Sequence, residues 1–124
     1  MNPSSLRPVG QTTDRLLSKL MSASQLRSRV IAGNIANQNT PGYTRREVRF
    51  EERLLEALEG GSDIEATDPE IVLDNLSPAR SDGNNVNLEV ELNAMRENRI
   101  LYETFASIVE GRGNIKRAAL GGSN

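Results

Sequence analysis

Residues 34–43, which read NIANQNTPGY, end a helical pattern abruptly and so divide the chain into separate elements. Before this motif, apolar side chains recur every three or four residues, which predicts an amphipathic helix from about residue 14 to residue 37. Thr40 precedes a proline and is expected to be extended, and Pro41-Gly42 suits the centre of a type II turn. Gly42 would supply the positive φ angle that this turn requires. Taken alone, a helix followed by Thr-Pro-Gly indicates only a loop.

The first helix is expected to begin at Thr13 or Asp14 as its N-cap and to close at Asn37, because Asn tolerates the left-handed conformation of a C-cap. Its apolar stripe is broad, which predicts contact with more than one neighbouring helix. The packing residues expected in it are Leu16, Leu20, Val30, Ile31 and Ile35.

A second long helix is predicted over residues 86–120, with Asn87 as its cap. Two rows of side chains at spacings of three and four run along it, the first being Leu88, Leu92, Met95, Arg99, Tyr102, Ala106 and Val109, and the second Asn98, Leu101, Phe105, Ile108, Arg112 and Ile115. Two rows favour packing in a bundle of several helices, although a helix in an ordinary small bundle explains the spacing equally well. Gly111 and Gly113 each cost about 1 kcal/mol relative to alanine, so a bend or frayed turn is expected there.

Residues 44–85 are expected to form a partly irregular, acidic connector between the helices. It would hold an extended stretch over 45–50, then a short helix with Phe50, Leu54, Leu55 and Leu58 on one side, ended by Gly60-Gly61. Residues 59–74 are expected to be solvated, with local order only around residues 71–73. The fold class predicted is all-α, with a flexible segment at 1–12, an N-terminal helix and turn at 13–43, the connector at 44–85, a C-terminal helix at 86–120 and a tail at 121–124.

Composition limits how much core the chain can build. The 124 residues include only two Phe, two Tyr and no Trp, and chains poor in large side chains are marginally stable as monomers. Charge is uneven: residues 1–43 sum to +4 and residues 44–82 to −6, within a net charge of −2. The sparse basic residues and the acidic total argue against a nucleic-acid-binding protein.

The chain lacks the residues on which most catalytic and metal sites depend. It has no His and no Cys, and its carboxylates lie on helix faces or in the connector, where no apolar neighbours would raise a pKa. No phosphate-binding loop or calcium-loop spacing occurs. We therefore expect no enzyme, no cofactor and no metal. No apolar run is long enough to insert in a membrane and no cleavable signal is apparent, so the default location from sequence alone is the cytoplasm.

The motif at 34–43 resembles the N-terminal signature of the bacterial flagellar axial proteins, the rod and hook family, which end their first helix with a pattern like NxANxxTPGY. The matching residues are Asn34, Ala36, Asn37, Thr40, Pro41, Gly42 and Tyr43. Residues 82–102 are similar to a C-terminal signature of the proximal rod members of that family, through Gly83, Asn84, Asn85 and Val86, followed by Leu88, Glu91, Asn98 and Tyr102.

This resemblance implies a structural subunit of the flagellar rod whose two terminal helices form a coiled-coil domain that packs side by side along a tube. It implies assembly with copies of itself, with other rod proteins and with the inner-membrane ring or its rod adaptor. It also implies export through the flagellar type III apparatus without a cleaved signal peptide, and a periplasmic location in the basal body, which overrides the cytoplasmic default. No nucleic acid and no membrane insertion are implied.

Two alternatives remain at this stage. One is another rod protein of the same family, and the other is a soluble helical adaptor or export chaperone that binds a partner helix. An unrelated adaptor would have no reason to carry both terminal signatures in one chain.

Overall fold

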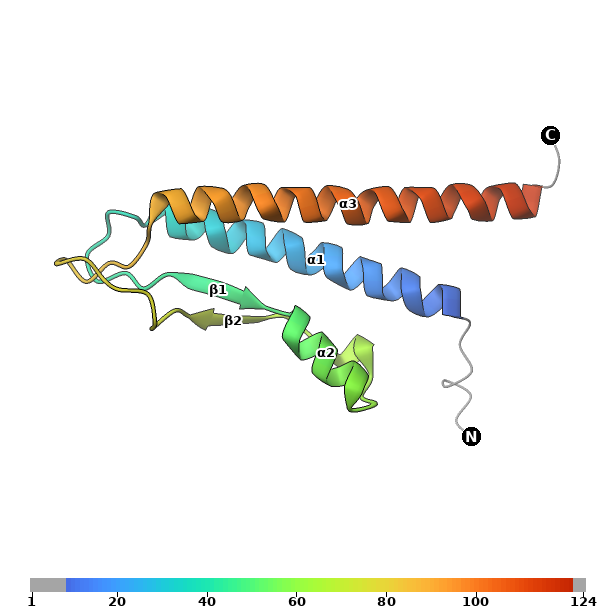
Figure 1. The fold of residues 1–124 in the computed structure, drawn as a ribbon, viewed down its shortest axis with the longest axis horizontal. Coiled ribbons are helices and arrows are strands. Elements are labelled where there is room, and N and C mark those ends of the chain that lie inside the picture. Colours follow the sequence, from blue (N-terminus) through green and yellow to red (C-terminus); the bar gives the residue numbers. More distant parts are fainter. Residues whose placement is uncertain (1–8, 122–124) are drawn as a thin grey trace.

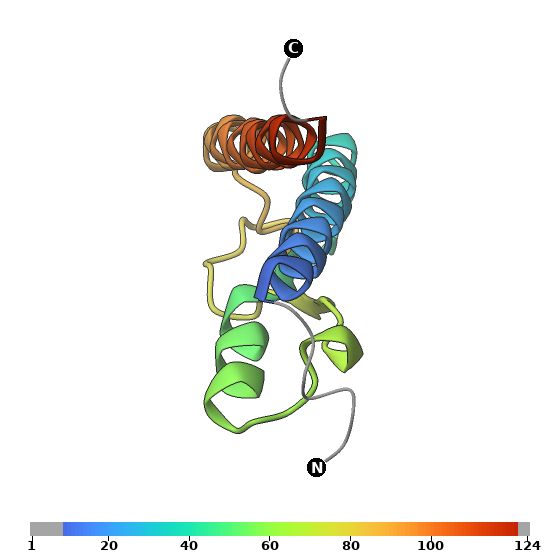
Figure 2. The same ribbon diagram turned by 90° about the vertical axis from the view of Figure 1, so that its right-hand side faces the viewer.

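The computed structural model describes residues 9–121, in which two long antiparallel helices dominate (Figure 1). Helix α1 spans Val9–Ala36 and helix α3 spans Leu88–Gly121. The elements between them are β1 (Arg46–Arg49), α2 (Glu51–Glu59), the short 3-10 helix η2 (Ile64–Ala66) and β2 (Glu70–Leu73). Figure 2 shows α1 lying between α3 on one side and the α2 and strand region on the other.

The prediction of an all-α fold is wrong in the middle segment. Strands β1 and β2 pair antiparallel, with Arg46 opposite Leu73 and Arg49 opposite Glu70. The extended stretch expected at 45–50 is β1, and its partner β2 lies where the acidic connector was expected to have local order, around residues 71–73. No short hairpin turn joins the two strands, since α2 and η2 intervene, and the residues of β2 do not alternate between apolar and polar. The fold is mostly helical with one small sheet.

Helix α1 begins earlier than expected. It starts at Val9, so Thr13 and Asp14 lie inside the helix and neither is its N-cap. Asp14 instead pairs across to α3, accepting hydrogen bonds from Arg112 at 2.8 Å and from Lys116. The flexible segment expected at 1–12 therefore loses residues 9–12 to α1, whereas residues 1–8 and 122–124 lie outside the described part of the chain.

Helix α3 begins where expected and does not break at its glycines. Asn87 caps it, because its Oδ1 accepts the backbone N–H groups of Glu89 at 3.0 Å and Val90 at 3.3 Å. The helix runs through Gly111 and Gly113 to Gly121 as one continuous cylinder (Figure 1). Asp14 pairs with Arg112 and Lys116 in this glycine-containing turn and so links it to α1.

A small hydrophobic core lies beneath α1. Phe50, Ala23 and Leu54 form it, and it is covered by partly buried Leu16, Leu20 and Ile64. Helix α2 reaches the core through Leu54 and Ala57, whereas Leu55 and Leu58 are 55% and 49% exposed. Of the four apolar side chains predicted to lie on one side of this helix, only Phe50 and Leu54 are therefore buried. Leu54 and Ala57, three positions apart, form the contacting face instead.

The uneven charge of the sequence is explained by pairing within the chain. Basic side chains of α1 meet acidic side chains of the middle segment: Arg15 with Glu65 at 2.7 Å, Lys19 with Asp68 at 3.4 Å, and Arg27 with Glu51 at 2.7 Å. Each is at least partly solvent-exposed, so each contributes little alone. Together they hold the middle segment along one face of α1.

Among the helices of residues 9–121, none combines the length and the apolarity that a membrane span requires.

Candidate functional site

Asn34 sits at the end of α1 and completes the hydrogen bonding of strand β1. Its side chain is fully buried. The amide Nδ2 donates to the carbonyl of Arg46 at 2.8 Å, and Oδ1 accepts the N–H of Arg46 at 2.9 Å. Because one amide carries both a donor and an acceptor, it satisfies the outer edge of β1 as a neighbouring strand would. Oδ1 also accepts the hydroxyl of Tyr43 at 3.1 Å, and Nδ2 reaches Glu91 Oε2 at 3.2 Å.

The turn after α1 has the predicted shape but a different helix end. Gly42 has a φ of 74°, and the N–H of Tyr43 donates to the carbonyl of Thr40 at 3.2 Å, as in a type II turn. Asn37 is not left-handed, since only glycines have positive φ in the described chain. Its Nδ2 donates to the carbonyl of Gly33 at 2.8 Å, and its Oδ1 accepts the hydroxyl of Thr40 at 3.1 Å. Side-chain hydrogen bonds thus replace the expected left-handed cap.

The second signature folds directly onto this turn. Asn84 is fully buried, and its Nδ2 donates to the carbonyls of Asn37 and Thr40, both at 2.8 Å. The N–H of Gly42 donates to the carbonyl of Asp82 at 2.8 Å. Gly83, with a φ of 84°, lies so close that a Cβ there would be 3.3 Å from the Cα of Gly42. The two signatures therefore contact each other through backbone and amide groups.

Asn85 extends the sheet where its two strands separate. The N–H of Asp74 donates to the carbonyl of Arg45 at 2.9 Å, which is the last direct bond of the ladder. Asn85 then bridges the remaining pair, since its Oδ1 accepts the N–H of Arg45 at 2.7 Å and its Nδ2 donates to the carbonyl of Asp74 at 2.7 Å. Asn34 thus completes the backbone hydrogen bonding of β1 at Arg46. Asn85 does the same for Arg45, the residue before the strand.

An ionic cluster centred on Arg45 completes this region. Its Nε donates to Glu91 at 2.6 Å, and its Nη1 donates to Asp74 at 2.8 Å and to Glu47. Glu91 is fully buried, and the side chains of Asp74 and Arg45 are 7% and 12% exposed. Removing Arg45 would leave the buried carboxylates of Glu91 and Asp74 without their cation, which is strongly destabilising.

Ionisation in the cluster is set by these contacts. The hydroxyl of Ser77, at 2.6 Å from Asp74 Oδ2, and Arg45 hold the pKa of Asp74 well below its usual range, although burial opposes this. Burial also disfavours the charged form of Arg45, but its hydrogen bonds to Asp74, Glu91 and Glu47 prevail and raise the pKa of Arg45. Both groups are therefore charged across the physiological range.

We call this set of contacts the signature junction. Its members are Asn34, Asn37, Thr40, Gly42, Tyr43, Arg45, Asp74, Gly83, Asn84, Asn85 and Glu91. It joins the end of α1, the start of α3 and one end of the sheet. Its groups are paired with one another, which suits a rigid joint rather than a reactive site.

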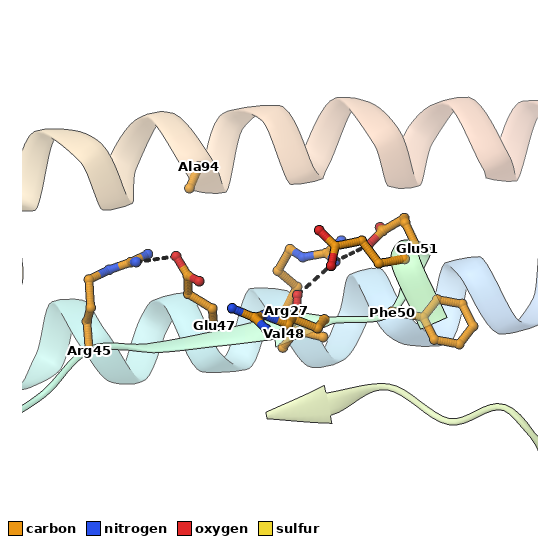
Figure 3. Close-up of a pocket in the computed structure, with 9 residues that line it drawn as sticks. Arg27, Arg45, Glu47, Val48, Phe50, Glu51 and Ala94 are labelled. Carbon is orange, nitrogen blue, oxygen red and sulfur yellow. Dashed lines mark hydrogen bonds and ion pairs between the residues drawn. The ribbon is translucent and has the colours of Figure 1, made fainter. Parts of the chain in front are cut away.

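A groove of about 400 Å³ lies beside the junction, between β1 and α3. Figure 3 shows Arg45 directed at Glu47, Arg27 reaching Val48 and Glu51, and Ala94 across from them. Arg27 donates to the carbonyl of Val48 at 3.2 Å. These charges are balanced across the groove, which favours neither an anionic nor a cationic ligand. Within residues 9–121, no three His, Cys, Asp or Glu side chains are grouped so that they could hold a metal ion.

Comparison with known proteins identifies the family. A family model described as flagella basal body rod protein matches residues 21–44, which covers the second half of α1 and the turn. The flagellar basal body rod protein FlgB of Borrelia hermsii is 32% identical over 113 residues, covering 75% of this chain and 84% of that protein. The chain belongs to the FlgB family of flagellar basal body rod proteins.

Two further FlgB proteins agree with this assignment. FlgB of Borreliella burgdorferi is 30% identical over 103 residues, which cover 67% of this chain and 76% of that protein. FlgB of Bacillus subtilis is 29% identical over 117 residues, with 86% and 91% covered. As a member of the FlgB family, the chain is a structural subunit of the flagellar rod. The resemblance inferred from the two signatures is thereby confirmed, and a rod subunit is favoured over a helical adaptor.

Within this FlgB-family fold, several polar groups of α3 contact α1. Glu91 meets Asn34, and Asn98 Nδ2 donates to the carbonyl of Ser24 at 2.7 Å. Tyr102 and Gln25 lie within hydrogen-bond reach at 3.4 Å, and Arg112 pairs with Asp14. The second predicted row is therefore divided. Its members Asn98 and Arg112 contact α1, whereas Leu101, Ile108 and Ile115 are 43%, 43% and 70% exposed.

The predicted packing residues likewise fall into two groups, those at least partly buried in the single chain and those exposed. Ile31 is buried in α1, and Leu16, Leu20, Val30 and Ile35 are partly buried. On α3, Met95, Tyr102 and Phe105 are partly buried, whereas Leu88, Leu92 and Val109 are, like Leu101 and Ile108, exposed in the single chain. Ala36 at the end of α1 and Pro41 in the turn are exposed. Val86 is buried, and its N–H donates to Asn84 Oδ1 at 2.8 Å.

Sequence reasoning missed the ionic part of the junction. In the sequence, Glu91 looks like an acidic residue in the first turn of a helix, where a negative charge suits the helix dipole. Asp74 looks like one more acidic residue in a solvated connector. The available signal was the place of Glu91 in the C-terminal signature, together with an arginine directly after the turn.

Proposed function

We propose that the chain is a subunit of the proximal part of the rod, where it transmits torque from the motor without catalysis. It is exported through the flagellar type III apparatus without a cleaved signal peptide. It assembles in the periplasm with copies of itself, with other rod proteins and with the inner-membrane ring or its adaptor. In this proposal the α1–α3 pair forms the wall of the rod, and the signature junction fixes the direction in which the sheet and α2 leave that wall.

The observation that carries this proposal is the row of apolar side chains that α3 leaves exposed. Leu101, Ile108 and Ile115 recur every seven residues along one flank, so they can form a continuous seam with another helix. A single chain that leaves such an apolar row exposed offers it to neighbouring subunits.

The test separates assembly from folding by substituting two positions of α3. Leu101→Asp alters an exposed position, so the unfolding free energy of the isolated chain should change by no more than about 0.5 kcal/mol, while motility is lost. Phe105→Asp places a charge against α1 and should lower stability by several kcal/mol as well as abolish motility. The readouts are swimming in soft agar and recovery of the chain with detergent-resistant basal bodies.

Leu55→Asp is the matched control, because Leu55 is 55% exposed on α2, away from the helix pair. Cells with this variant should swim, and the variant should sediment with basal bodies. Normal swimming with Leu101→Asp would contradict the assembly role of the α3 flank. Absence of the wild-type chain from the basal-body fraction would contradict the proposed function as a whole.

A further inference from the structure

Strand β2 forms the open edge of the two-stranded sheet. In Figure 1, β2 lies at the lower margin of the molecule, with β1 above it and no other element of residues 9–121 directly below it. The opposite edge is closed, because Asn34 satisfies both the N–H and the carbonyl of Arg46 on β1. Of the two edges, that of β2 is therefore the one accessible to a further strand.

The pairing register shows which backbone groups this edge presents. Arg46 lies opposite Leu73, and Arg46 turns its backbone groups outward to Asn34. Opposite residues of an antiparallel pair share this orientation, so Leu73, and Ile71 two positions earlier, also turn their N–H and carbonyl groups away from β1. In the described range 9–121 these four groups have no hydrogen-bond partner. They form two donors and two acceptors at the spacing that an added strand uses.

The side chains at these two positions also suit an added strand. Ile71 and Leu73 lie on the same face of the sheet and are 49% and 54% exposed. Natural proteins often protect an open edge with a charged residue or a proline, and neither is present at positions 71 and 73. Addition of an extended segment to such an edge is a recurrent mode of protein recognition, in which apolar side chains at alternate positions pack together.

Arg46 indicates the charge of the partner. Because it lies opposite Leu73, its side chain is on the same face of the sheet as Ile71 and Leu73. The Arg46 side chain is exposed and forms no ion pair with any residue that the structure describes. A carboxylate on the same face of an added strand would supply the missing opposite charge.

A second copy of β2 fits this edge poorly. The antiparallel register that uses all four groups pairs Ile71 with Leu73 of the other copy, and it brings Glu70 opposite Asp74 of that copy. A parallel register would place Glu70 beside its own equivalent. Like charges directly opposite each other are destabilising, and both registers leave Arg46 without a carboxylate. The charges therefore favour a chain of different sequence.

We propose that the outer edge of β2 binds an extended segment of a different protein, which adds to the sheet as a third strand. Its backbone bonds to Ile71 and Leu73, its apolar side chains at alternate positions lie beside these two residues, and its carboxylate pairs with Arg46. This inference goes beyond the proposed function, because it assigns a partner to the sheet and not to the α1–α3 pair.

The test titrates a synthetic peptide into the full-length, nitrogen-15-labelled chain in a buffer with sucrose. The peptide alternates valine with threonine and carries one glutamate on the valine face. We expect the amide signals of Ile71 and Leu73 to shift, and their hydrogen exchange to slow about tenfold when nine-tenths of the chain is bound. The amide of Val72, which pairs with Glu47 on β1, should change little.

The same peptide with N-methyl groups on alternate backbone nitrogens is the matched control. It keeps the side chains but lacks the donors, so it should not bind. Unchanged amide signals of Ile71 and Leu73 with the unmodified peptide, or equal binding of both peptides, would overturn the inference. Arg46→Gln should weaken binding about two- to fivefold, and equal affinity would overturn the role of Arg46.

Proline substitutions test the orientation of β2 itself. Leu73→Pro removes an outward N–H, so the urea midpoint should stay near wild type while peptide binding is lost. Val72→Pro removes an N–H that faces β1, so its urea midpoint should fall. Equal destabilisation by the two changes would overturn the assignment of the edge.

Sedimentation of the purified chain distinguishes the two kinds of partner. Self-association that is the same in wild type and Leu73→Pro supports a different protein as the occupant of the edge. A dimer of the wild-type chain that is lost in Leu73→Pro would show that a second copy occupies the edge, and would overturn the inference.

Discussion

At the residue scale, single amide side chains replace backbone partners that this small sheet lacks. Asn34 satisfies both the N–H and the carbonyl of Arg46 on the outer edge of β1, and Asn85 bridges Arg45 and Asp74 where the ladder ends. A two-stranded sheet is barely stable alone, because its edges remain open. Asn34 thus closes the edge of β1 that faces α1, and Asn85 closes the end of the ladder.

Asn34→Asp tests this role with almost no change of shape. The carboxylate loses the donor to the carbonyl of Arg46 and places a negative charge beside Glu91, whose Oε2 lies 3.2 Å from the present Nδ2. We expect a loss of about 2–4 kcal/mol in unfolding free energy, measured by urea denaturation in a buffer with sucrose to favour the folded state. Asn39→Asp, at an exposed position of the same turn, is the control and should be nearly neutral.

Asp74 should make the junction sensitive to acid. Its pKa is lowered in the folded chain by Ser77 and Arg45, so its contribution to stability is present above the pKa of the unfolded chain, about 3.9. The contribution is lost as pH falls from there toward the lower folded value. Asp74→Asn should be less stable than wild type at pH 7 and should show a flatter stability profile below about pH 4.

Asp68→Asn is the control for this titration, since the Asp68 side chain is 82% exposed. Thermal melts in sucrose, between about pH 2 and pH 7, should show the wild-type acid dependence in Asp68→Asn and a reduced dependence in Asp74→Asn. Parallel profiles for all three chains would show that Asp74 is not held by Ser77 and Arg45 as described.

At the element scale, glycine is needed in the turn after α1 but not inside the helix that precedes it. Gly42 has a φ of 74°, so Gly42→Ala should strain the turn and lower stability by about 1–3 kcal/mol. Gly33 lies inside α1 with nothing within 4 Å of an added Cβ, so Gly33→Ala should raise stability by up to about 1 kcal/mol. Equal effects of the two changes on the urea midpoint would argue against the type II turn.

The elements differ in how far the sequence determines them. The turn at 40–43, the stretch that became β1 and the Asn87 cap are local, so nearby residues were enough to predict them. The pairing of β1 with β2 is not local: it depends on Asn34 and Asn85, which lie outside both strands. In the same way, burial of Glu91 cannot be read from its neighbours, because the arginine that pairs with it lies 46 positions earlier in the chain.

At the scale of the whole molecule, the chain has a small buried core and exposes apolar side chains on α3. This distribution matches a subunit whose packing is completed by assembly. The core around Phe50 is small, and the contacts between α1 and α3 include a buried hydrogen bond and a partly exposed ion pair. Apolar side chains are instead available on the outer flank of α3. A hydrophobic core this small leaves little net stability once the conformational entropy lost on folding is subtracted.

We therefore expect weak helicity for the isolated chain at low concentration. Far-UV circular dichroism should show helix content rising with protein concentration or with added sucrose, because both favour the packed state. The thermal transition of the dilute monomer should be broad. A sharp cooperative transition with high helix content at low concentration would contradict this account of the molecule.

The central claim is that the segment directly after α1 and the start of α3, far apart in the sequence, form one buried junction, and a double-mutant cycle on Arg45 and Glu91 tests it most directly. Arg45→Met and Glu91→Gln, alone and together, should give unfolding free energies with a coupling of about 1–3 kcal/mol, measured by urea denaturation in sucrose. The account predicts that the double variant loses less stability than the sum of the single variants. Losses that add within about 0.5 kcal/mol would contradict it, because the two side chains would then not share a junction.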